Sequence, residues 1–93
     1  MKRLEPNEVL LEGRWIKAEG KVVADEVAHR IDELISSQLT KVAASADGWE
    51  VLYLDQGDGR FWELSYPQQG WHGGGPPLLK NVNRDYAQSK YRV

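Results

Sequence analysis

The chain has 93 residues, a net charge of −2 and no cysteine. A chain of this length buries enough surface for one modest core, so we expect a single domain over residues 1–93. The lack of cysteine excludes disulfides and thiolate-bound metals, and no apolar run approaches the length of a membrane span. The first residues also lack the apolar segment of a signal peptide, so we expect a cytoplasmic protein.

The first part of the sequence predicts a strand, a short return strand and one long helix. Apolar and polar residues alternate over 9–17, and a turn at 19–20 leads into a short strand over 21–23. Asp25 is a typical helix cap. After it, apolar residues recur at helical spacing, which predicts a helix over residues 27–42. Its apolar stripe is Val27, Ile31, Leu34, Ile35, Leu39 and Val42.

The second part predicts a hairpin, a further strand and a short helix. Residues 45–48 end the long helix, and a strand follows over 49–55. Asp58-Gly59 is a hairpin signal, so the chain should return over 60–66. A last strand is expected over 78–82, with Asn83 as the cap of a short C-terminal helix. Together these patterns predict an α+β fold: a small antiparallel sheet of about four strands with one long helix packed on one face.

Acidic residues gather in the middle of the chain. Residues 44–79 carry five acidic side chains against one arginine, a local net charge of −4. Residues 80–93 carry four basic side chains against one acidic one, a local net charge of +3. An acidic middle argues against a nucleic-acid partner, because affinity for nucleic acid depends mainly on neutralising phosphates. It suits a protein partner that is itself basic.

A set of short motifs spread along the chain resembles one known family. These are Gly13-Arg14-Trp15, Asp25, Arg30-Ile31, Gly48-Trp49, Leu52-Tyr53, Asp58-Gly59-Arg60, Trp62-Glu63-Leu64, Tyr66-Pro67 and residues 72–77. In this order and spacing they resemble the immunity protein 27 family of bacterial polymorphic-toxin systems, over roughly residues 10–91. The resemblance implies an antitoxin that binds and neutralises a cognate toxin by stoichiometric contact. Such a protein needs no catalysis, cofactor or metal.

We expect the contact surface on the predicted hairpin and on the glycine-rich loop that follows it. The hairpin acids Asp55, Asp58 and Glu63 would meet a basic toxin surface, such as a nuclease presents to its substrate. Trp71 and His72 lie in the loop, where an aromatic ring is a typical interface anchor. The alternatives are that Trp71 folds back over the sheet as a lid and that His72 bonds nearby backbone. Most of the four tryptophans are expected in the core, and at least one glycine of 73–75 should have a positive φ. Neither nucleic acid nor a membrane is expected as a partner.

Two other functions fit the same residues. A small hydrolase or ligand-binding enzyme could use Asp58, Glu63 and His72, although an acid–base pair also needs a cleft and a raised pKa. The alternative for Glu63 is a cross-strand pair with a basic residue. A structural accessory domain without a toxin is the third reading.

Three familiar site patterns are excluded. The run 72–75 copies an oxyanion loop, but the chain has no Gly-x-Ser-x-Gly nucleophile motif. A calcium loop beginning at Asp55 would need a glutamate where Pro67 stands. The two histidines, His29 and His72, offer no spacing for a metal site.

Overall fold

The computed structural model describes residues 4–67 and 75–93 and contains seven strands and two helices in this part of the chain. In chain order they are β1 (Leu10–Glu12), β2 (Trp15–Ala18), β3 (Lys21–Ala24), α1 (Glu26–Ser37), β4 (Leu39–Ala44), β5 (Val51–Asp55), β6 (Phe61–Ser65), β7 (Leu78–Val82) and α2 (Arg84–Tyr91).

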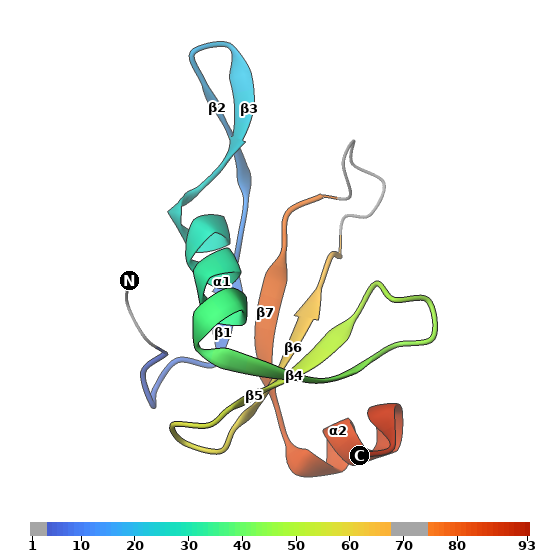
Figure 1. The fold of residues 1–93 in the computed structure, drawn as a ribbon. Helices are drawn as coiled ribbons and strands as arrows, with labels where there is room; N and C mark the ends of the chain where they lie inside the picture. The colour runs from blue at the N-terminus through green and yellow to red at the C-terminus, as the bar shows by residue number, and fades with distance from the viewer. Residues whose placement is uncertain (1–3, 68–74) are drawn as a thin grey trace.

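Five of the strands form one antiparallel sheet in the order β1-β7-β6-β5-β4 (Figure 1). Strands β4 to β7 follow one another as a meander, and β1 pairs with β7 at the far edge. Strands β2 and β3 form a separate hairpin that projects beyond the sheet. The α+β class was predicted correctly, but the sheet has one strand more than expected, and the additional hairpin stands apart from it.

Helix α1 covers one face of the sheet and forms the main core with it. Asp25 caps the helix, because its side-chain oxygen accepts a hydrogen bond from the Ala28 amide at 2.8 Å. The core cluster on this face is Leu11, Ile31, Leu34, Leu39, Tyr53, Trp62, Leu64 and Leu79. Ile31 and Leu34 are fully buried, as the helical spacing predicted.

The helix is shorter than predicted, because it ends at Ser37 and the chain continues as strand β4. Leu39 still reaches the core, but from a strand, and Val42 lies at a bulge with 37% of its surface exposed. In the last turn of α1, the Ser36 hydroxyl donates to the backbone carbonyls of Asp32 and Glu33, and the Ser37 hydroxyl donates to that of Glu33. The helical spacing of apolar residues beyond Ser37 is therefore a coincidence, and pairing with β5 makes this segment a strand. Residues 45–48 form the turn between β4 and β5 and do not end a helix.

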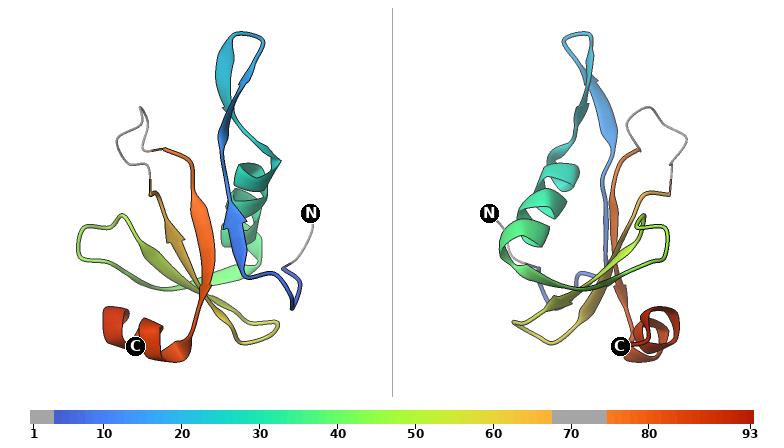
Figure 2. Two further views of the ribbon diagram at one scale, coloured as in Figure 1. Left: turned by 180° about the vertical axis from the view of Figure 1, so that it is seen from behind. Right: turned by 45° about the vertical axis from the view of Figure 1, so that its right-hand side comes forward.

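Helix α2 covers the opposite face of the sheet. A smaller core lies there, formed by Leu52, Val82 and Ala87, with Phe61 and Tyr91 packed against it. The right-hand view of Figure 2 shows the two helices on opposite sides of the sheet. The apolar residues on both faces of the predicted hairpin are thus explained, because neighbouring residues on β5 and β6 point alternately to α1 and α2.

The strand predicted over 9–17 is broken at Gly13, where the chain leaves the sheet and enters the projecting hairpin. The Gly13 amide donates to the carbonyl oxygen of Pro77 at 2.8 Å. A Cβ at this position would lie 2.9 Å from the same oxygen and 3.0 Å from the Cβ of Ala28. Only glycine permits this close approach of backbone to backbone.

Candidate partner-binding surface

The turn between β5 and β6 is a tight, internally bonded loop. The Asp55 carboxylate accepts from the Gly57 amide at 2.9 Å, and the Gly59 amide donates to the Asp55 carbonyl at 2.7 Å. Gly59 has φ +78°, which an Asp-Gly turn requires. Asp55 is 9% exposed, so this carboxylate shapes the turn more than it presents charge to solvent.

Asp58 lies at the exposed tip of the same turn and is held by Arg60. Its two carboxylate oxygens accept from the Arg60 amide at 3.0 Å and from Arg60 Nε at 2.6 Å. Burial raises the pKa of Asp58, but these bonds and the charge of Arg60 outweigh it and hold the pKa below its ordinary value. Asp58 is therefore ionised at neutral pH and fixed in direction.

Arg60 also attaches the N-terminal segment to the hairpin. Its terminal nitrogens donate to the carbonyls of Glu8 at 2.6 Å and Glu5 at 2.9 Å, and its guanidinium lies 4.8 Å from the centre of the Trp62 ring. Glu8 in turn receives two bonds of 2.7 Å from Arg30 of α1. The turn, the helix and the N-terminal segment are thereby held as one unit.

A surface hollow of about 380 Å³ opens between these elements. Asp55 and Asp58 line one side of it, together with Gly57. Leu4, Pro6, Leu34 and Gln38 complete the lining. Two predicted site residues, Asp55 and Asp58, are therefore brought together here, whereas Glu63 does not belong to this hollow.

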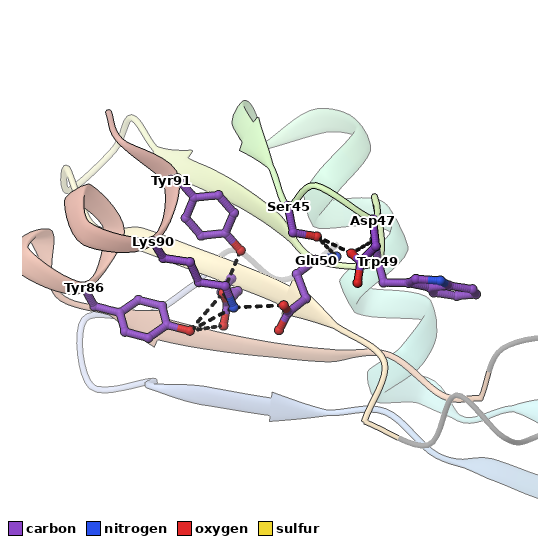
Figure 3. Close-up of polar contacts among 8 residues, drawn as sticks. Ser45, Asp47, Trp49, Glu50, Tyr86, Lys90 and Tyr91 are labelled. Atoms are coloured by element: carbon purple, nitrogen blue, oxygen red, sulfur yellow. Dashed lines mark hydrogen bonds and ion pairs between the residues drawn. The ribbon is translucent and has the colours of Figure 1, made fainter.

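Glu63 is buried on the other face of the sheet, and its partners come from α2, three of whose side chains (Tyr86, Lys90 and Tyr91) are labelled in Figure 3. Its carboxylate accepts from the hydroxyl of Tyr91 at 2.6 Å and from that of Tyr86 at 3.0 Å, and it pairs with Lys90 Nζ at 2.8 Å. Lys80 lies directly opposite Glu63 in the strand register, yet its ammonium lies over the Tyr86 ring. The predicted pairing with a basic residue is thus present, but the residue is Lys90 of α2 and not a cross-strand neighbour.

Glu63, Tyr86, Lys90 and Tyr91 form a bonded group, called here the Glu63 cluster, in which the charge of Glu63 is balanced by that of Lys90. Burial raises the pKa of Glu63, but the bonds from Lys90, Tyr91 and Tyr86 outweigh it and hold the pKa below its ordinary value. Burial lowers the pKa of Lys90, but its bonds to Glu63 and Glu50 raise it well above the usual range. Burial and the carboxylate of Glu63 raise the pKa of Tyr91. A carboxylate that stays ionised and fully bonded is suited to holding α2 in place and unsuited to acting as a general acid.

Exposure of the tryptophans differs from the prediction that most are core. Trp62 is fully buried, whereas Trp49 is 43% exposed and Trp15 is half-buried. Trp71 and His72 lie outside the described residues. Gly75 has φ +78°, so the expectation of a positive φ within 73–75 is confirmed.

Within residues 4–67 and 75–93, no three histidine, aspartate or glutamate side chains gather in a metal-binding arrangement. The same part of the chain contains no helix long and apolar enough to cross a membrane.

Comparison with known protein families gives one result that decides the classification. The family model described as Immunity protein 27 matches residues 17–83, which is more than half of the chain. The chain belongs to the immunity protein 27 family. Searches of curated proteins and of solved structures found no match.

The family match covers the end of β2, all of β3 and α1, and strands β4 to β7 of the five-stranded sheet; β1 lies before it. It ends at residue 83, so α2 and its three side chains that bind Glu63 lie beyond the matched stretch. The motif Gly13-Arg14-Trp15, on which part of the resemblance rested, lies before it. Membership of the family therefore rests on the helix, the sheet and the hairpin turn of the matched region.

Asp58 and Glu63, two of the three residues proposed for an enzyme site, lie in different parts of the structure. Asp58 is paired with Arg60 at the turn, while Glu63 is bonded to α2 across the sheet. His72, the third member, lies outside the described residues. Neither carboxylate has the raised pKa of a general acid, since both are held below their ordinary values.

Proposed function

We propose that this protein is a cytoplasmic immunity protein that binds and neutralises a cognate bacterial toxin by stoichiometric protein–protein contact. The observation that carries the proposal is the family match over residues 17–83. Blocking a toxin requires a stable surface of complementary shape and charge and no chemistry of its own. The toxin's own activity is left open, and a nuclease is one class whose basic surface would fit.

The acidic turn around Asp58 is proposed as the steering part of the contact surface. Asp58 is ionised, exposed at the tip and held in one direction by Arg60. Asp55 supports the shape of the turn, and Glu63 holds α2, so both would act on binding through the fold. Trp71 and His72 remain proposed contacts from the loop.

The test begins with the toxin encoded by the adjacent gene. Coexpression of this protein should restore growth of cells that produce the toxin, and the purified pair should form a complex of fixed stoichiometry. A toxin that kills equally well with and without this protein, and that does not bind it, would refute the proposal.

The steering role of Asp58 has its own test. Asp58→Asn should slow association with the toxin and flatten the dependence of the association rate on salt, because steering is electrostatic and screened. Glu33→Gln on the exposed side of α1 is the matched control and should change neither quantity. Equal association rates for Asp58→Asn and the parent at low salt would place the steering surface elsewhere.

A further inference from the structure

An exposed aromatic pair lies at the turn between β4 and β5. Trp49 is 43% exposed and meets the half-buried Tyr66 edge to face, with ring centres 6.1 Å apart. Figure 3 shows the indole of Trp49 pointing away from the other side chains drawn. Trp62, in contrast, is fully buried in the core. Trp49 therefore presents apolar ring surface to a partner, which Trp62 does not.

The turn that carries Trp49 is fixed by its own hydrogen bonds. Asp47 Oδ1 accepts from the Ser45 hydroxyl at 2.6 Å and from the Trp49 amide at 2.9 Å. The Ser45 hydroxyl oxygen also accepts from the Glu50 amide at 3.1 Å, and the Ser45 amide donates to the Glu50 carbonyl at 2.8 Å. Gly48 adopts φ +78° with open space around it, which completes the turn. A ring on so constrained a loop loses little conformational entropy when a partner covers it.

The Glu63 cluster is connected to this turn through Lys90, which pairs with Glu50. Lys90 Nζ lies 2.9 Å from a Glu50 carboxylate oxygen and 2.8 Å from one of Glu63. Glu50 directly follows Trp49 in the chain, so the ion pair ties the turn to α2 and to the middle of the sheet (Figure 3). The single positive charge of Lys90 is thereby shared between two carboxylates.

The surroundings of the aromatic pair are acidic. Asp47 is exposed, and the hydrogen bonds from Ser45 and from the Trp49 amide hold its pKa below its ordinary value. Asp32 of α1 lies close enough to add to the effect of burial in raising the pKa of Tyr66. An apolar ring on a rigid turn, with the carboxylates of Asp47 and Asp32 nearby, is complementary to an apolar socket bordered by basic residues.

We propose that Trp49, supported by Tyr66, is the principal anchor of the toxin interface and inserts into an apolar socket that is bordered by lysine or arginine side chains on the toxin. This inference rests on the proposed function and names the part of the surface that carries most of the binding. The Asp58 turn attracts the toxin over distance, and the Trp49 turn retains it. Partner-facing rings of this kind act mainly on dissociation.

The decisive measurement is surface-binding kinetics with the toxin domain encoded by the adjacent gene, inactivated at its catalytic residue. Trp49→Ala should raise the dissociation rate by about tenfold or more, as loss of a central anchor does, and change the association rate by less than about threefold. Trp49→Phe should retain part of the residence time. Val22→Ala, at a 62% exposed position on the projecting hairpin, is the matched control and should behave as the parent.

A double-mutant cycle separates anchoring from mere stability. Ser45→Ala loosens the turn without touching the ring, so it should weaken binding in the parent and have little further effect once Trp49 is alanine. Additive losses of affinity would show that Ser45 does not act through the ring. Melting temperatures of all variants in the absence of toxin control for folding.

The outcomes distinguish this inference from the proposed function. If the parent fails to bind the toxin, the proposed function fails and the anchor fails with it. If the parent binds and Trp49→Ala keeps the parent's residence time, the anchor is refuted while the proposed function stands. If the free protein sediments as a dimer that Trp49→Ala abolishes, the ring is covered by a second copy, and the toxin-facing role is overturned.

Discussion

Glu63→Gln removes the charge that attaches α2 to the sheet while keeping the size of the side chain. The carboxylate is 3% exposed and is bonded to Lys90, Tyr86 and Tyr91. Removing one partner of a buried ion pair costs about 3–5 kcal/mol. Lys90 keeps Glu50 as a partner and is 29% exposed, so we expect the lower part of that range or slightly less.

A loss of about 2–3 kcal/mol in the free energy of unfolding is a large share of the total for a domain of this size. For a domain near 100 residues, each kcal/mol lowers the melting temperature by about 4–8 °C, so a fall of roughly 8–24 °C is expected. Urea unfolding followed by circular dichroism measures the free energy directly. Glu33→Gln, an exposed acid on α1, serves as the control and should unfold like the parent.

The stability contributed by the Glu63 carboxylate should also depend on pH, and the direction of this dependence follows from its pKa. The pKa of Glu63 in the folded protein lies below its ordinary value of 4.5, so above pH 4.5 the carboxylate contributes its full stabilisation. As the pH falls below 4.5, the unfolded chain takes up the proton first, and the stabilisation is lost as the pH passes through the lower folded-state pKa.

The difference between the parent and Glu63→Gln should therefore be largest above pH 4.5 and shrink below it. A variant within about 0.5 kcal/mol of the parent at neutral pH would refute the reasoning, because that is the usual effect of an unimportant surface change. A difference that stays constant as the pH is lowered would also refute it.

Three further changes test the packing of the fold, each by urea unfolding or thermal melting. Leu34→Ala leaves a cavity at a fully buried position and should cost about 2–5 kcal/mol, so an unchanged melt would disprove the placement of α1. Gly13→Ala places a Cβ 2.9 Å from the Pro77 carbonyl oxygen and should cost about 1–3 kcal/mol of overpacking; equal stability would mean that the backbones can separate freely. Asp25→Ala removes the cap on the Ala28 amide and should cost about 1 kcal/mol, with faster hydrogen exchange at Ala28 as its local sign.

The sequence was sufficient wherever a structure depends on neighbouring residues. The Asp25 cap, the Asp58-Gly59 turn and the Asn83 cap were all predicted in the right places, because each depends on bonds that span only a few residues. The motifs of the matched family could likewise be recognised from the sequence. Local chemistry thus determined most of the elements and the family.

Elements that depend on distant partners were decided by the tertiary structure. Residues 39–44 continue the helical spacing of α1, yet they form β4 because β5 offers antiparallel partners to all of them except Val42 at the bulge. Nothing local indicates that β1 pairs with β7 across most of the chain, or that the strand must break at Gly13 to pass Pro77.

For the candidate surface too, the residue types could be predicted from the sequence, whereas their exposure depended on the tertiary structure. Acidic residues in the predicted hairpin could be read from the sequence, but whether each is exposed could not. Glu63 is buried because α2 folds across β6 and brings Tyr86 and Tyr91, 23 and 28 residues further along the chain, to its carboxylate. Trp49 is 43% exposed at the turn between the edge strand β4 and β5. A pattern of residue types determines what each segment can do, whereas exposure depends on which segments pack together, and only long-range contacts settle that.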